Sequence, residues 1–188
     1  IKSEYNGNVN TDENWIYDDN GNISIYTQNV YNLTTLAQRS EEKYIYDSYN
    51  NVLNKDVIYS SITNDGSIVI TGKKNSTWSY DQYGNTLTFI EDGKSLYMNN
   101  SSYRNEENWK YNNGQAIEHF RKEYQGYGDN LTLNKQIEEN WNNDINGKQL
   151  GHNIITSYYN YYGSIQKYII ETKVDESGRQ LLNNQTYQ

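Results

Sequence analysis

The chain lacks cysteine and proline altogether. Without cysteine it can form no disulfide bond and offers no thiol as a nucleophile or soft metal ligand, and cysteine usage gives no indication of its compartment. Long apolar runs are also missing, although a membrane-spanning helix needs roughly 20 apolar residues. We therefore expect no insertion into a membrane.

Positive charge is scarce compared with negative charge. The chain has 16 Lys and Arg residues against 24 Asp and Glu residues, for a net charge of -8. Acidic residues spread along the whole chain repel phosphate backbones and anionic lipids. Nucleic acid is therefore not expected as a partner.

Aliphatic residues are also scarce, and aromatic residues take their place. Leu, Ile, Val and Phe make up only about a fifth of the chain, which lies near the compositional border of disorder. The 21 Tyr and 4 Trp residues supply the missing apolar area. Each aromatic ring buries on the order of 150 to 250 Å² and leaves a polar edge free for water. This composition favours thin sheets with partly hydrated faces over a deep apolar core.

A ten-residue motif recurs along the chain. The stretch NWIYDDNGNI at 14–23 returns as TWSYDQYGNT at 77–86, and less regular copies share the pattern aromatic-x-Tyr-Asp-x-x-Gly-Asn-x-aliphatic. The lead residues are Trp15, Tyr44, Trp78, Trp109 and Trp141. They recur about every 31 residues, within the range typical of repeat proteins. Weaker copies near the middle of each period reduce the underlying unit to about 15 residues. Their expected turn glycines are Gly66, Gly93, Gly128 and Gly163.

The motif has the chemistry of a β-hairpin corner. Trp15 and Tyr17 lie two residues apart, so both side chains point to one face of a strand, and aromatic residues favour strands. Asp18 can bond the backbone two residues further on, and Gly21 accepts a positive φ without steric cost. In the second copy Asn50 takes the place of this glycine. The sequence therefore predicts an all-β fold, an antiparallel tandem β-hairpin repeat forming a meander or solenoid-like sheet.

Two stretches contain helix-forming residues. They lie at 34–43 and 133–141, and part of the second has the i, i+4 spacing of a helix. The same apolar residues also occupy alternating strand positions, and Trp141 is in register with the other lead residues. We therefore favour strands for both stretches.

The element [Trp/Tyr]-x-Tyr-Asp-x-x-Gly-Asn resembles the YD repeat of Rhs-type, teneurin-like and bacterial toxin proteins. It is also similar to Asn-rich tandem repeats in secreted surface proteins of Bacteroidetes. The resemblance touches most of the chain from Trp15 to Leu181, although YD repeats usually recur at a period of about 20 residues. It implies an extracellular β-structure of tandem hairpins, usually a segment of a much larger protein, and it carries no catalytic residues.

The lead tryptophans allow two interpretations. Exposed rings flanked by Asn, Gln and Asp can stack on sugar rings and bond their hydroxyl groups. Alternatively, the rings form a buried ladder that joins one repeat to the next, which we favour because repeats reuse equivalent positions for stacking. The candidate sugar-binding residues are Trp15, Trp78, Trp109 and Trp141.

Structural calcium is the only cofactor that the sequence suggests. The stretch NNDING at 142–147 matches the front half of an EF-hand loop, with candidate ligands Asn142, Asp144 and Asn146, but Asn153 stands where the loop needs a bidentate Glu. The alternative is that Asp and Asn form the turn itself. His119 and His152 lie 33 residues apart, close to one long period, so they are expected on adjacent repeats. Two ligands do not make a metal site.

These patterns favour a structural role over catalysis. No serine or threonine stands out beside a base, and no pair of acids stands out, so we expect no enzyme. We expect one repeat region over 1–188, excerpted from a longer repetitive protein and serving as a secreted or cell-surface stalk, adhesin or filament. Its expected partners are further repeats or other copies of itself, because uncapped sheet edges pair readily. The alternative is a carbohydrate-binding module that uses exposed Trp and Tyr faces.

Overall fold

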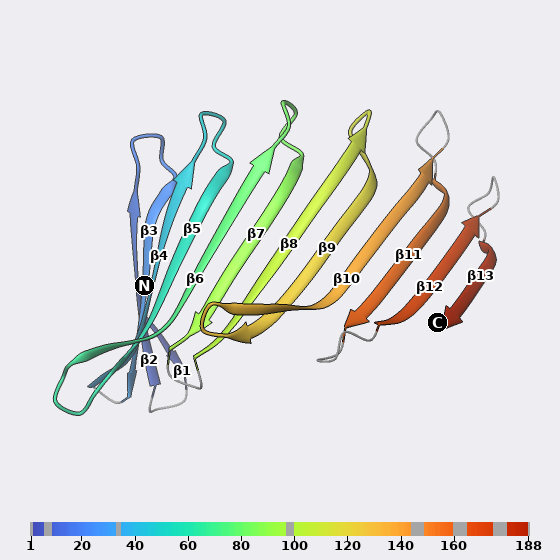
Figure 1. The fold of residues 1–188 in the computed structure, drawn as a ribbon. Coiled ribbons are helices and arrows are strands. Elements are labelled where there is room, and N and C mark those ends of the chain that lie inside the picture. Colours follow the sequence, from blue (N-terminus) through green and yellow to red (C-terminus); the bar gives the residue numbers. More distant parts are fainter. Residues whose placement is uncertain are drawn as a thin grey trace. The chain divides into compact units, whose positions relative to one another are not determined.

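The computed structural model describes residues 2–5, 9–32, 35–96, 100–143, 149–159, 165–174 and 180–187. They form one 13-stranded sheet in which the strands follow one another in chain order (Figure 1). The strands are β1 (Lys2–Tyr5), β2 (Val9–Tyr17), β3 (Ile23–Asn32), β4 (Thr35–Tyr46), β5 (Val52–Ile62), β6 (Ile68–Tyr80), β7 (Thr86–Ser95), β8 (Ser101–Asn112), β9 (Gln115–Tyr127), β10 (Asn130–Asn143), β11 (Gln149–Tyr159), β12 (Ile165–Val174) and β13 (Gln180–Tyr187). No helix in this part of the chain has the length and hydrophobicity needed to span a membrane.

The sheet is an antiparallel meander, which confirms the predicted fold class. The motif turns connect β2 to β3, β4 to β5 and β6 to β7, so one long period corresponds to one hairpin and the 15-residue unit to one strand with its turn. Contacts divide the chain into two units. Unit 1 is Ile1–Trp78, Glu91–Ser102 and Tyr127–Asp129, and unit 2 is Ser79–Ile90, Tyr103–Gly126 and Asn130–Gln188.

Both stretches of helix-forming residues are strands where the structure describes them. Residues 35–43 belong to β4, and 133–141 belong to β10. In β10, Ile137 faces Thr156 and Trp141 faces His152 on the neighbouring strand. Pairing with neighbours on both sides therefore overrides the local helix propensity, as tertiary context commonly does.

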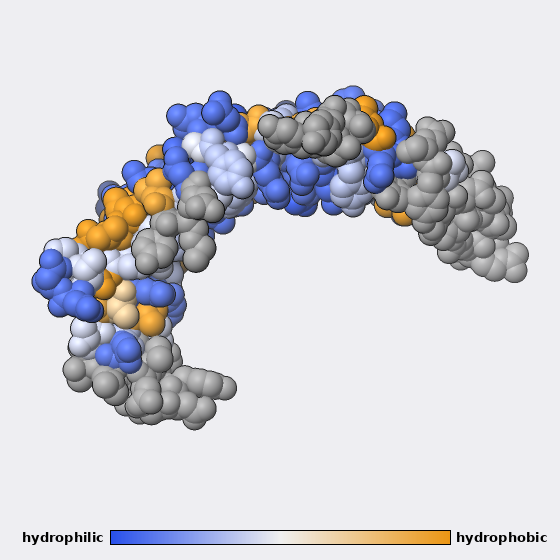
Figure 2. Space-filling model, turned by 60° about the horizontal axis from the view of Figure 1, so that its bottom comes forward, coloured by the Kyte–Doolittle hydropathy of each residue, from blue (hydrophilic) through white to orange (hydrophobic). Residues whose placement is uncertain are grey.

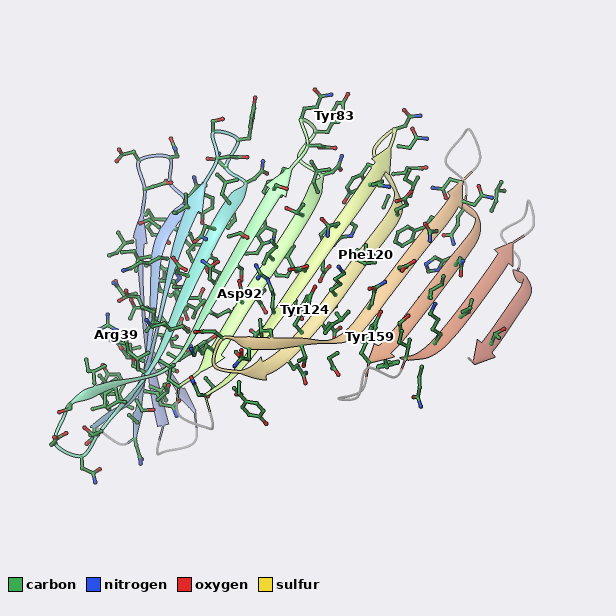
Figure 3. All side chains as sticks on the ribbon, in the orientation of Figure 1. Arg39, Tyr83, Asp92, Phe120, Tyr124 and Tyr159 are labelled. Carbon is green, nitrogen blue, oxygen red and sulfur yellow. The ribbon has the colours of Figure 1, made fainter. Side chains whose placement is uncertain are left out.

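The sheet has almost no apolar core. Among the residues whose burial is described, Val57 is the only hydrophobic side chain that is fully covered, at 1 % exposure. The buried polar residues are Thr27, Ser60, Ser76 and Ser157. Side chains project from both faces of the sheet (Figure 3), and most are half-buried. On the face shown in Figure 2, hydrophobic residues occur in small groups separated by hydrophilic ones.

Cross-strand rows of side chains replace a core. In unit 1, one row runs from Glu42 through Val57 to Lys74 on three neighbouring strands. The Nζ atom of Lys55 lies 2.7 Å from a Glu42 carboxylate oxygen, and that of Lys74 lies 2.9 Å from Glu91. Long charged side chains can cover apolar surface with their aliphatic stems while the charged ends remain hydrated. The stems beside Val57 therefore keep it from water.

Candidate functional site

The first motif turn is closed by backbone and aspartate bonds together. The Asp18 N–H donates to the Asn22 carbonyl at 2.8 Å, and the Gly21 N–H donates to the Asp18 carbonyl at 3.0 Å. The Asp18 carboxylate accepts from the backbone N–H groups of Asn20 and Asn22 at 2.9 and 2.8 Å. Gly21 has a φ of 85°, which places it in the left-handed region. This is a three-residue hairpin loop, a type I turn followed by a left-handed residue.

The same bonds recur in the next two copies. Asp47 accepts from the backbone N–H groups of Tyr49 and Asn51, and Asp81 accepts from those of Tyr83 and Asn85. The residues at the left-handed position are Asn50, with a φ of 66°, and Gly84, with a φ of 83°. The positive φ of Asn50 confirms the prediction that it takes the place of the turn glycine. Asn tolerates this conformation better than most other non-glycine residues.

Hydrogen bonding lowers the pKa of all three motif aspartates. The backbone N–H of Asn22 is the main cause for Asp18. The side-chain amides of Asn51 and Asn85 are the main causes for Asp47 and Asp81. Each of these bonds favours the ionised carboxylate over the protonated acid. The motif aspartates are therefore turn-forming residues that work as anions.

The thermal stability of the chain is expected to fall in acid because of these turns. Their stabilisation is fully present above the pKa of an unfolded aspartate, about 3.9, and is lost as the pH falls through the lower pKa of the folded state. Circular dichroism melting between neutral and strongly acidic pH measures this loss. Substituting Asp18, Asp47 and Asp81 by Asn keeps an acceptor oxygen but removes the titration. An acid loss of the same size in this triple variant would contradict the prediction.

Other copies use different turns. In the fourth, Asn113 and Gly114 both have positive φ, 49° and 78°, as in a two-residue type I′ hairpin. The predicted turns at Gly66 and Gly128 are confirmed. The predicted turn at Gly93 is wrong, because Gly93 is buried within β7. Only eight residues lie between it and Gly84, fewer than any strand from β2 to β12 contains. Gly163 lies outside the described residues.

Contacts also join successive hairpins in unit 1. The side-chain amide of Asn22 donates to the side-chain oxygen of Asn50 in the next motif turn, at 2.9 Å. The Tyr46 hydroxyl donates to the Ile23 carbonyl at 2.9 Å. Burial and the charge of Asp18 raise the pKa of Tyr46. Tyr46 therefore packs beside the first motif turn, and the second motif hairpin is tied to the first.

Unit 2 shows the same relation between motif tyrosine and preceding turn. Burial raises the pKa of Tyr111, and the charge of Asp81 raises it further. Asp81 forms the turn one long period before Tyr111. The charge of the preceding motif aspartate thus acts on the motif tyrosine in both units.

The four lead tryptophans are all half-buried. Trp109 stacks on His119 with ring centroids 4.8 Å apart and planes 12° apart, and Trp141 stacks on His152 at 5.1 Å and 8°. Trp15 packs more obliquely on Tyr26 at 5.7 Å. Each of these contacts lies within one hairpin. One ring face in each of the two parallel stacks is therefore covered by a histidine.

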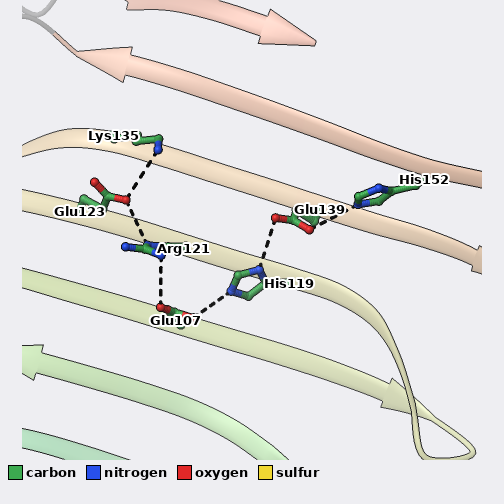
Figure 4. Close-up of polar contacts among 7 residues, drawn as sticks. All are labelled: Glu107, His119, Arg121, Glu123, Lys135, Glu139 and His152. Carbon is green, nitrogen blue, oxygen red and sulfur yellow. Dashed lines mark hydrogen bonds and ion pairs between the residues drawn. The ribbon is translucent and has the colours of Figure 1, made fainter. Parts of the chain in front are cut away.

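A chain of acidic and basic groups runs beside these stacks in unit 2 (Figure 4). His119 on β9 lies between two acids, with Nε2 at 3.1 Å from Glu107 on β8 and Nδ1 at 3.8 Å from Glu139 on β10. His152 Nε2 on β11 lies 3.3 Å from the other oxygen of Glu139. His119 is only 14 % exposed, so the group is partly shielded from solvent. Side chains from four neighbouring strands thus form one continuous chain.

A second branch of this network extends along β9 and β10. Arg121 lies 3.7 Å from Glu107 and 3.1 Å from Glu123, and Lys135 lies 3.8 Å from Glu123. Each of these charges therefore faces an opposite charge. Such ion pairs are weak evidence for net stability, because the cost of removing the charges from water offsets much of their attraction. Among the described residues, no group of three His, Cys, Asp or Glu side chains has the arrangement of a metal site.

Sequence reasoning identified the two histidines but missed their acidic partners. His119 and His152 lie on alternate strands and share Glu139 of the strand between them. A usable signal was the count across each turn, because His119 follows Trp109 by ten residues and His152 follows Trp141 by eleven. Trp15 faces Tyr26 eleven residues later, and Trp141 faces His152 at the same interval, because a register shift beside the turn adds one residue to the count. The acids Glu107 and Glu139 each lie two residues before a lead tryptophan.

The predicted calcium ligands fall mostly outside the described part of the chain. Asp144 and Asn146 lie outside it. Asn142 is exposed in β10, where it faces Gly151 of β11.

Comparison with models of known protein families and with curated proteins finds no match to this chain. A proposal of function therefore rests on the repeat motif, the resemblance that it carries and the geometry of its side chains.

Proposed function

We propose that the chain is a structural repeat segment of a secreted or cell-surface protein, serving as a stalk, adhesin or filament. The observation that carries this proposal is the repeated turn. Asp18, Asp47 and Asp81 make the same bonds, and Tyr46 and Tyr111 lie beside the turns that precede them. A device repeated in this way serves to stack equivalent hairpins.

The side chains of the charged network support a structural role rather than catalysis. Glu107 and Glu139 both contact histidine, and Arg121 and Lys135 both contact acids. A catalytic acid, base or nucleophile has to be presented to a substrate in a cleft. Here the charged groups contact one another across neighbouring strands. We therefore propose no enzymatic activity.

Location and partners follow from the same proposal. The resemblance to YD repeats supports an extracellular setting. The contacts between successive hairpins include bonds between motif residues, such as Asn22 and Asn50. Further repeats of this kind, in the same chain or in another copy, are therefore the partners that fit this sheet best. The acidic net charge of -8 disfavours nucleic acid.

The proposal is tested by removing one long period. Deletion of residues 19–47 removes β3 and β4 and joins Asp18 to Ser48, which restores an Asp-x-x-Asn-Asn turn. Because repeat proteins are stabilised mainly by contacts between neighbours, the shortened chain is expected to keep its strand spectrum and a cooperative melt. Far-UV circular dichroism and thermal melting give the measurement.

Deletion of β3 alone, Ile23–Asn32, is the matched control. It places β4 directly beside β2 and moves the next motif turn to the opposite edge of the sheet, so the bond between Asn22 and Asn50 cannot form. This variant is therefore expected to lose much of the strand signal. Loss of structure in both deletion variants would overturn the repeat scaffold, because a fold of exchangeable hairpins tolerates the first deletion. If both variants kept the same strand signal, the order of the hairpins would not matter to the fold. That result would also overturn the repeat scaffold.

A further inference from the structure

A hollow of about 370 Å³ lies on the surface of the sheet in unit 1, over four neighbouring strands. Its volume lies at the small end of the range for small-molecule sites, about 300 to 1,000 Å³. Strands β3, β4, β5 and β6 all contribute to it. The lining residues are Gln28, Val30, Gln38, Arg39, Ser40, Tyr59, Ser60 and Thr71.

Small residues in one cross-strand row account for the hollow. Gln28, Ser40, Tyr59 and Gly72 face one another in register on the four strands. The neighbouring row has long side chains at two of the corresponding positions, Glu42 and Lys74. At Ser40 and Gly72 the row has no long side chain. The atoms that cover the sheet surface at Glu42 and Lys74 are therefore missing here.

The tyrosine of this row forms a wall of the hollow. A Cβ atom at Gly72 would lie 3.5 Å from Cδ2 of Tyr59, so the tyrosine side chain leans over the glycine. The missing side chain at Gly72 therefore leaves room for the ring on the β6 side of the row. Tyr59 is 44 % exposed, so part of its ring is accessible from solvent. An exposed, positioned ring is a platform for stacking.

The polar groups around this ring are neutral, with one exception. Gln28, Gln38, Ser40 and Thr71 offer amide and hydroxyl groups, which both donate and accept hydrogen bonds. Gln28 is oriented by a bond from its side-chain nitrogen to Glu13 at 3.3 Å, which leaves its carbonyl oxygen as an acceptor. The charged exception, Arg39, is bonded to Glu41 at 2.9 Å. The hollow therefore suits a neutral ligand with several hydroxyl groups.

We propose that this hollow binds a neutral mono- or disaccharide, with one sugar face on Tyr59 and its hydroxyl groups bonded to Gln28, Gln38 and Ser40. The site is separate from the four lead tryptophans. Sugar rings present C–H groups on one face and hydroxyl groups around the rim, which matches an aromatic wall beside amide and hydroxyl groups. The site does not depend on the scaffold role, so either proposal can fail alone.

The test is a titration of the isotope-labelled chain with a fixed set of neutral sugars, followed by two-dimensional NMR. The set is cellobiose, maltose, lactose and diacetylchitobiose, and the acidic comparison is glucuronic acid. Binding of at least one neutral sugar is expected to shift the amide signals of Gln28, Ser40 and Tyr59. No shift with any sugar of the set, shifts centred elsewhere, or binding of glucuronic acid alone would each overturn the assignment.

Variants separate the hollow from general surface effects. Tyr59→Ala is expected to weaken binding by about tenfold or more, which corresponds to about 1.4 kcal/mol. Tyr158→Ala removes a tyrosine of nearly equal exposure, 42 %, from β11 and is expected to leave binding unchanged. Ser40→Leu fills the hollow without removing the ring and is expected to abolish binding. Melting curves establish that each variant is folded, and undiminished binding by folded Tyr59→Ala or Ser40→Leu would refute the proposal.

Discussion

Replacing Trp109 by alanine is expected to lower the free energy of unfolding by about 2 kcal/mol. A fully buried tryptophan costs about 3 to 5 kcal/mol when truncated, and Trp109 is half-buried. Part of the loss comes from its stack on His119, with ring centroids 4.8 Å apart. Aromatic stacks of this kind contribute about 0.5 to 1.5 kcal/mol beyond the area that they bury. Urea denaturation of the variant, followed by circular dichroism, measures the change.

A double-mutant cycle isolates the stack from the rest of the effect. Trp109→Ala and His119→Ala are expected to be non-additive by about 1 kcal/mol, because each removes the same contact. Trp109 and Ile169 lie on β8 and β12, which are not neighbouring strands, and Ile169 pairs with Ile155, so Trp109→Ala and Ile169→Ala are expected to be additive within about 0.5 kcal/mol. Additive behaviour of Trp109 with His119 would mean that the parallel ring geometry contributes nothing to stability.

Val57→Ala is expected to cost about 2 kcal/mol, a large effect for the loss of two methyl groups from a thin sheet. Val57 is 1 % exposed and lies in register between Glu42 and Lys74. The surrounding charged side chains cannot fill the space that the methyl groups leave, because their ends are held in ion pairs with Lys55 and Glu91. Chemical denaturation again gives the measurement.

Val69→Ala is the matched control for this prediction. Val69 lies on the adjacent strand β6 and is 43 % exposed, so the same chemical change is expected to cost no more than about 0.5 kcal/mol. The comparison removes the difference in strand propensity between valine and alanine, which is common to both sites. Equal losses at the two positions would show that burial of Val57 does not stabilise unit 1.

The turns could be predicted from the sequence because their chemistry is local. Asp18, Gly21 and Asn22 lie within five residues, and every bond that closes the turn is made among these and their immediate neighbours. The sequence also predicts Asn50 in place of the turn glycine for the same reason. Gly93 was misread, because a glycine after an aspartate has turn chemistry wherever it occurs. Only the lengths of the flanking strands decide whether the chain reverses there.

The candidate sites were less predictable because they depend on residues far apart in the chain. The sequence indicated that the lead tryptophans occupy equivalent positions. It did not indicate that Trp109 and Trp141 would each be covered by a histidine, or that Glu139 would bond two histidines from the strands on either side. These neighbours are set by the register of antiparallel pairs. A shift of one residue would move each side chain to the opposite face.

By itself, the sequence determined the all-β class, the antiparallel hairpins, the period of about 31 residues and the turn aspartates, since all of these follow from composition and short-range bonds. Only the tertiary structure decided which residues meet across strands. Val57 is buried because long charged residues face it, and the hollow exists because Ser40 and Gly72 fall in one row with Tyr59. The physical reason is that a single-layer sheet has no common core, so each side chain takes its environment from the cross-strand neighbours that register assigns.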